Sequence, residues 1–120
     1  MTATPTPTPN PSQPGHRVRA TLLIVSRYSG ARTRLIRIRA RNLPGNAQVV
    51  VRCCGPHCPR PRSRTASATH LRRLWKALIR EVFTAGDRVI FTFTAPGLLP
   101  ERTEILIRED AKPISKRLGS

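Results

Sequence analysis

The clearest helical period in the chain lies in the stretch Thr69-His-Leu-Arg-Arg-Leu-Trp-Lys-Ala-Leu-Ile-Arg-Glu-Val-Phe83. Seven large apolar residues in it recur at i, i+3, i+4, i+7, i+8, i+11 and i+12: Leu71, Leu74, Trp75, Leu78, Ile79, Val82 and Phe83. This spacing gathers their side chains into one stripe of an α-helix, with the basic residues on the other side. We therefore expect a helix over 69–83, begun by Ser67 or Thr69 as N-cap and ended near Gly86, that packs against the β-segments around it.

Segments in which apolar and polar residues alternate lie on both sides of this helix. A two-residue period is typical of a strand with one buried and one exposed face. The predicted strands are residues 17–27, 34–41, 47–53, 88–94 and 102–108, and the Pro- and Arg-rich segment 54–68 is expected to be a loop. The order βββαββ predicts a mainly β or α+β fold, a small antiparallel β-sandwich or sheet with one amphipathic helix packed on it.

The length of 120 residues fits one domain with tails at both ends. Residues 1–16 are rich in Pro and Thr, which predicts a disordered, polyproline-like spacer. A docking peptide at Pro11-x-x-Pro14 is the alternative for this tail. We expect the single β-rich domain to span residues 17–111. The polar residues 112–120 are interpreted as a flexible C-terminal tail.

The net charge of +16 is unevenly distributed along the chain. Residues 1–80 contain fifteen Arg, one Lys and no acidic residue, whereas residues 81–120 contain six basic and six acidic residues. Such asymmetry is typical of proteins that bind a polyanion such as nucleic acid or an acidic polymer. The alternative is a solvated basic surface without a partner, since Arg outnumbers Lys as codon drift in a GC-rich genome would produce.

The candidate binding residues are basic side chains expected on exposed faces. In the segment 34–41, Arg37, Arg39 and Arg41 alternate with Ile36, Ile38 and Ala40, which are expected on the buried face. This alternation predicts an exposed ladder of guanidinium groups about 7 Å apart. If this strand pairs with 47–53 as a hairpin, Arg52 would share that face. The full predicted polyanion-binding set is Arg37, Arg39, Arg41, Arg52, Arg60, Arg62, Arg64, Arg72, Arg73 and Lys76.

The segment Cys53-Cys-Gly-Pro-His-Cys58 is the only one with the chemistry of a site. Zinc could take Cys53, Cys54, His57 and Cys58, but four ligands within six consecutive residues strain a tetrahedron. A disulfide between Cys53 and Cys58 would close a small ring and needs an oxidising compartment. Three reduced thiols are the expected state in a cytosol. The metal reading is the weakest, and the other two stay open.

Three segments together resemble a known module: Val51-Arg-Cys-Cys-Gly-Pro-His-Cys-Pro59, Phe83–Gly97 with its Thr-x-Pro-Gly turn, and Thr103–Arg108 with the Lys112-Pro113 that follows. The module is a small, Ig-like Cys-x-Gly-x-x-Cys-Pro β-sandwich of actinobacterial proteins, mostly of uncharacterised function and often exported. The resemblance covers about residues 45–113. It implies that Cys53 and Cys58 are paired, with Gly55 in the turn, and that the role is not enzymatic. Cys54 and the long helix depart from the pattern.

The residue patterns needed for catalysis are missing. The three His are scattered, no acid–His or paired-carboxylate spacing is present, and there is no Gly-rich phosphate loop. We therefore expect a non-enzymatic module without a cofactor or a small-molecule substrate. Nucleic-acid binding would be sequence-tolerant, because the five aromatic residues are expected mainly in the core and the helix stripe fits the core better than a recognition helix.

A structural or protein-interaction module of a cell surface or virion-type assembly is the alternative function. No signal peptide or membrane span is visible in the sequence. We therefore expect a cytoplasmic protein if Met1 is the native start, with an exported or virion-associated protein as the alternative.

Overall fold

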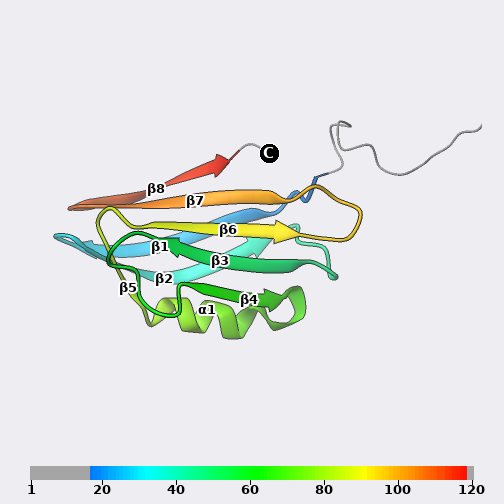
Figure 1. Cartoon of the computed structure of the whole chain (residues 1–120), viewed down its shortest axis with the longest axis horizontal. Helices are drawn as coiled ribbons and strands as arrows, with labels where there is room; N and C mark the ends of the chain where they lie inside the picture. The colour runs from blue at the N-terminus through cyan, green and yellow to red at the C-terminus, as the bar shows by residue number, and fades with distance from the viewer. Residues whose placement is uncertain (1–16, 119–120) are drawn as a thin grey trace, which may run out of the picture.

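The structure is a computed structural model that describes residues 17–118. It is a β-sandwich of two antiparallel sheets (Figure 1), with strand order β1-β2-β5 in the first and β4-β3-β6-β7-β8 in the second. The elements are β1 (Thr21–Ser29), β2 (Arg32–Arg41), β3 (Gln48–Cys54), β4 (Ser63–Ser67), the 3-10 turn η1 (Ala68–His70), α1 (Leu71–Ile79), β5 (Val82–Thr84), β6 (Arg88–Thr94), β7 (Glu101–Arg108) and β8 (Ala111–Leu118). The predicted fold class, a small antiparallel β-sandwich with one amphipathic helix, is confirmed.

The core lies between the two sheets and consists mainly of aliphatic side chains and phenylalanines. Every second residue of β3, β6 and β7 is buried, which is the two-residue period of a strand with one face against a core. On the five-stranded sheet, Val49, Phe91 and Phe93 are completely buried. On the three-stranded sheet, Leu35 and Phe83 are the largest buried side chains.

Helix α1 closes one open side of the sandwich, between β2 of the first sheet and β4 of the second (Figure 1). Leu74 and Leu78 of its apolar stripe are buried. Trp75 is half-buried, and its ring centroid lies 6.2 Å from that of Phe91. The helix therefore packs by the stripe that its sequence period indicates.

The predicted C-terminal boundary of the helix is wrong, because α1 ends at Ile79. At the other end, Ser67 is the N-cap residue of η1, which leads directly into α1, but it makes no side-chain capping bond. The last two residues of the predicted stripe belong to β5, where Phe83 pairs with Thr33 and is buried while Val82 is exposed. Pairing with β2 satisfies the backbone of this segment and still buries Phe83, so the chain leaves the helix early. Gly86, with a φ of 96°, lies in the turn between β5 and β6.

The structure also corrects the predicted order of strands. Ser63–Ser67, expected within a loop, forms β4 beside β3. Ala111–Leu118, most of which was expected in a flexible tail, forms β8 beside β7. Both are edge strands with few buried apolar residues. They are recognised by their backbone pairing with the neighbouring strand and not by an alternation of apolar and polar residues. The predicted N-terminal tail of residues 1–16 lies outside the described residues.

A β-bulge divides β2 into two halves. Val25 of β1 faces Arg37, but the next residue, Ser26, faces Leu35, so that Ile36 has no partner opposite it. The extra residue shifts the alternation by one position. Leu35 and Ile38 therefore both point into the core, although they are three residues apart. The sequence interpretation, which placed Ile36 on the buried face with Ile38, is wrong for Ile36, which is 43% exposed.

We predict that the neighbours Leu35 and Ile36 differ sharply in their tolerance of truncation. Leu35→Ala should lower the free energy of unfolding by about 2–5 kcal/mol, because it leaves a cavity in the core. Ile36→Ala, the matched control, should change it by about 0.5 kcal/mol or less, because the side chain is solvated. Urea denaturation followed by Trp75 fluorescence measures both. Equal losses for the two variants would contradict the bulge.

Candidate polyanion interface

The outer face of the three-stranded sheet carries a row of guanidinium groups. We call these six residues of β1 and β2 the arginine face: Arg27, Arg32, Arg34, Arg37, Arg39 and Arg41. All six are exposed. Five of them follow one another along β2, and Arg27 joins them from β1, directly opposite Arg34. The face therefore extends along the full length of β2.

The bulge at Ile36 brings both halves of this row to the same side. In an uninterrupted strand, Arg34 and Arg37 would point to opposite faces, because side chains alternate every two residues. The extra residue at the bulge shifts the alternation by one position, so that Arg32 and Arg34 lie on the same face as the predicted Arg37, Arg39 and Arg41. Sequence reasoning missed Arg27, Arg32 and Arg34. The signal was the apolar doublet Leu35-Ile36 between two Arg-x-Arg patterns.

No ion pair neutralises the arginine face within residues 17–118. The ion pairs of this part of the chain are Arg64–Glu81, Arg88–Glu104 and Arg117–Glu101, at 3.9, 3.6 and 2.9 Å. Asp110 lies at the end of the β1–β2 hairpin, where its Oδ1 accepts a hydrogen bond from the Gly30 N–H. The arginine face thus has a strongly positive potential along most of its length.

Helix α1 adds further cations next to this face. Arg72, Arg73 and Lys76 of the predicted set are exposed on its outer side. Because α1 packs beside β2, Arg72 and Lys76 extend the positive surface around that side of the sandwich, whereas Arg73 lines the groove between α1 and β4.

The predicted grouping of Arg52 with Arg37, Arg39 and Arg41 is wrong. β3, which carries Arg52, pairs with β4 and β6, whereas β2 pairs with β1 and β5. The two strands are consecutive along the chain but belong to different sheets, so Arg52 projects from the opposite outer face.

The last three members of the predicted set lie at the entrance to β4. Arg60 and Arg62 are exposed in the segment between β3 and β4. Arg64 lies within β4, is half-buried and faces Glu81. It is therefore the least available of the predicted cations, and Arg60 and Arg62 are not part of the arginine face.

A basic groove of about 410 Å³ separates β4 from α1, with Arg64, Arg73 and His70 in its lining. His70 Nδ1 lies 2.9 Å from Ser67 Oγ and 3.1 Å from Thr69 Oγ1. No carboxylate lines the groove. The histidine therefore orders the start of the helix, and the groove lacks the acid–His arrangement of a nucleophilic site.

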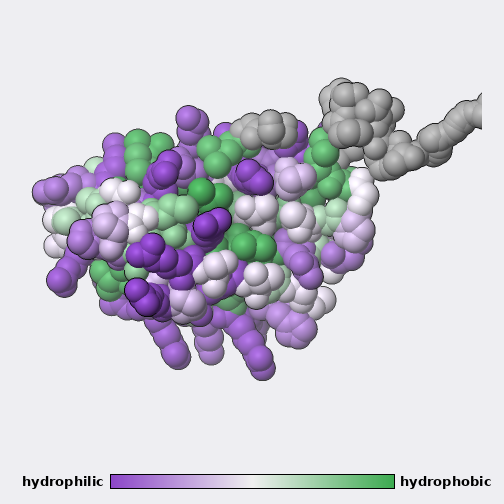
Figure 2. Space-filling view, in the orientation of Figure 1, coloured by the Kyte–Doolittle hydropathy of each residue, from purple (hydrophilic) through white to green (hydrophobic). Residues whose placement is uncertain are grey.

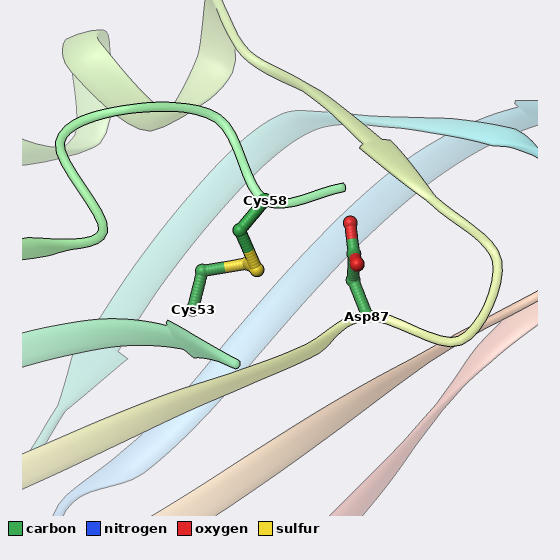
Figure 3. Close-up of side chains that lie close together, drawn as sticks. All are labelled: Cys53, Cys58 and Asp87. Carbon is green, nitrogen blue, oxygen red and sulfur yellow. A yellow bond between two sulfur atoms is a disulfide. The ribbon is translucent and has the colours of Figure 1, made fainter. Parts of the chain in front are cut away.

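The cysteine segment forms a disulfide between Cys53 and Cys58, one of the states that the sequence left open (Figure 3). Cys54 is free and half-buried. It follows Cys53 in β3, where successive side chains point to opposite faces of the sheet. The four-ligand zinc set of Cys53, Cys54, His57 and Cys58 is therefore not brought together.

Asp87, immediately before β6, is a buried carboxylate beside this disulfide (Figure 3). Its Oδ2 accepts a hydrogen bond of 3.0 Å from the Thr84 N–H. Its Oδ1 has no hydrogen-bond partner in the structure. A Cβ at Gly55 would overlap that oxygen, and Gly55 has a φ of 149°. The Cys-Cys-Gly sequence thus needs its glycine because the loop passes directly over the carboxylate.

Comparison of the chain with known protein families, with curated proteins and with solved structures finds no match. Within residues 17–118, no helix is long and apolar enough to cross a bilayer.

We predict that Gly55→Ala destabilises the fold by about 2–4 kcal/mol, because the added methyl group would overlap Asp87 Oδ1 in a backbone conformation that L-residues avoid. Gly45→Ala is the matched control, since a Cβ there meets no atom within 4 Å, and should change stability by about 1 kcal/mol or less. Urea denaturation of the oxidised proteins measures both. Similar midpoints for the two variants would show that the loop is free to move away from Asp87.

Proposed function

We propose that the protein binds polyanions, and nucleic acid in particular, through phosphate contacts that do not depend on base sequence. The observation that carries this proposal is the arginine face, six exposed guanidinium groups on one sheet without an ion-paired acid among them. Opposite-charge contacts with a phosphate backbone release counterions, and this release drives non-specific binding.

The geometry of β2 suits a phosphate backbone. Ten residues of strand extend over about 33 Å, which is the axial length of about ten base pairs of duplex. The guanidinium group is planar and always charged, and it contacts phosphate oxygens in pairs. Arg72 and Lys76, exposed on α1, can reach phosphates beside those that β2 contacts.

The distribution of aromatic residues supports binding without base recognition. Phe83, Phe91 and Phe93 are buried, and Trp75 packs on Phe91. Tyr28 is the only aromatic side chain with substantial exposure. Base-stacking platforms need several exposed rings, so contacts to the backbone of a duplex account better for this surface.

A protein-interaction module is the second candidate, and the opposite face of the sandwich favours it. Apolar patches lie between polar side chains over the outer face of the five-stranded sheet (Figure 2). The half-buried or exposed apolar residues that point outward there are Val50, Ile90, Leu106, Ile114 and Leu118. A partner protein could cover this face while the arginine face remains free for an anion.

We predict that the 120-residue chain binds a random-sequence DNA duplex with an affinity that falls steeply with salt. Replacement of Arg37, Arg39 and Arg41 by Ser should weaken binding at least about tenfold near 0.1 M salt and make the slope of log K against log[salt] shallower by about 2.7, because three phosphate contacts are lost. Fluorescence anisotropy over a salt series measures both quantities.

The matched control removes the same charge from the other side of the sandwich. Arg52, Arg102 and Lys116 are exposed on the outer face of the five-stranded sheet, and their replacement by Ser should leave the salt slope nearly unchanged. Equal effects of the two triple variants would show that net charge alone holds the DNA. Absence of binding by the unmodified protein at low salt would contradict the proposal and favour the protein-interaction module.

A further inference from the structure

We propose that reduction of the Cys53–Cys58 disulfide opens a binding site for a thiophilic divalent cation, with Zn²⁺ as the type ligand. The site consists of the two sulfur atoms and the carboxylate of Asp87. One ligand atom from each residue lies within 4.8 Å of the others, and all three residues are buried. This site is independent of the arginine face, and its failure would leave the proposed function untouched.

The carboxylate of Asp87 is the observation that points to a cation. It is completely buried, and it forms none of the ion pairs found within residues 17–118. One oxygen accepts a backbone hydrogen bond, while Oδ1 has no partner. A buried carboxylate is costly unless a charge or several donors satisfy it. The disulfide beside it supplies neither a positive charge nor a strong donor.

Reduction of the Cys53–Cys58 disulfide gives two thiols that can bind a metal ion together with Asp87. Two thiolates and a carboxylate are a ligand combination that Zn²⁺ accepts, at about 2.3 Å for sulfur and 2.0–2.2 Å for oxygen. A tetrahedral site requires the two sulfurs to be about 3.8 Å apart, a spacing that follows from the Zn–S length. The Cα atoms of Cys53 and Cys58 are 5.8 Å apart, so rotation of the side chains can provide it. The fourth position would hold water or a small ligand.

The backbone already places the three ligands on separate elements. Cys53 lies near the end of β3, Cys58 in the loop that follows, and Asp87 immediately before β6, which pairs with β3 through Val89 and Cys53 (Figure 3). A ligand from a distant part of the sequence relieves the strain of a zinc site made from one short segment. Gly55 completes the arrangement, because any larger residue would displace the carboxylate.

A phosphine can serve as the reductant of the disulfide. Phosphorus donates two electrons to the S–S bond, which breaks, and water donates the two protons, so that two thiols form. The oxygen of that water remains on phosphorus as a phosphine oxide. Binding of the cation then displaces the two thiol protons, so that two Zn–S bonds form and two protons enter the solvent. Removal of the cation by a chelator allows the disulfide to form again with oxygen as the oxidant.

The experiment uses the 120-residue chain, reduced with a water-soluble phosphine under argon and titrated with Co²⁺ alone. We expect a thiolate-to-cobalt charge-transfer band that saturates at one Co²⁺ per chain and disappears when Zn²⁺ is added. The oxidised protein should show no band. Asp87→Asn should weaken Co²⁺ binding at least about tenfold, whereas Cys54→Ser, the matched control, should leave it unchanged. Loss of the band in Cys54→Ser, or full affinity in Asp87→Asn, would overturn the assignment.

A second measurement does not depend on the folding of any variant. Urea unfolding of the reduced, unmodified chain should shift to a higher midpoint when Zn²⁺ is present, because the cation binds the folded state. The oxidised chain should show no such shift. An unchanged or lowered midpoint for the reduced chain would show that the folded protein has no site, and would overturn the proposal.

Discussion

The alternation of side chains along β2 is the constraint on which the rest of the structure depends. Leu35 and Ile38 must both enter the core, but three residues separate them and a regular strand would send them to opposite faces. The bulge at Ile36 resolves the conflict by adding one unpaired residue. The same shift brings Arg34 and Arg37 to one side. The core and the arginine face are thus two results of a single irregularity in the pairing with β1.

The acidic residues of the strands all lie in one of the two sheets. Strands β1 and β2 form most of one sheet and contain no acidic residue, whereas the ion pairs at Glu101 and Glu104 lie on β7 of the other sheet. Helix α1 joins the two sheets beside β2 and turns its cations outward. The outer face of the three-stranded sheet therefore carries arginines without acids, with Leu23 and Val25 exposed between them. The outer face of the five-stranded sheet combines cations, Glu104 and apolar patches. The fold converts an asymmetry along the sequence into an asymmetry in space.

The cysteine segment shows how a short loop depends on a residue far away in the sequence. Asp87 lies against Gly55 and beside the disulfide because β3 and β6 are neighbours in the sheet. The carboxylate also accepts a hydrogen bond from the Thr84 N–H and so stabilises the turn that leads from β5 into β6. Loop, disulfide and turn form one buried unit, and a cation bound there would link the ends of β3 and β6.

Local patterns in the sequence predicted correctly whether most segments form a helix or a strand, but they predicted the first and last residues of these elements less well. The alternation in 88–94 matches β6 residue for residue, and the apolar stripe identified the helix, because both periods arise from residues close together in the chain. The end of the helix was missed, since Val82 and Phe83 continue the helical period but gain more from pairing with β2. β4 and β8 were missed because edge strands need little alternation.

By itself, the sequence determined the β-rich fold class, the amphipathic helix, the excess of positive charge and the small set of cysteines that can pair. These are properties of composition and of short-range period. Only the tertiary structure decided that Arg27, Arg32 and Arg34 join the arginine face, that Arg52 does not, and that Asp87 lies beside Cys53 and Cys58. Each of these depends on which strands pair and in which register, and pairing joins residues that the sequence keeps far apart.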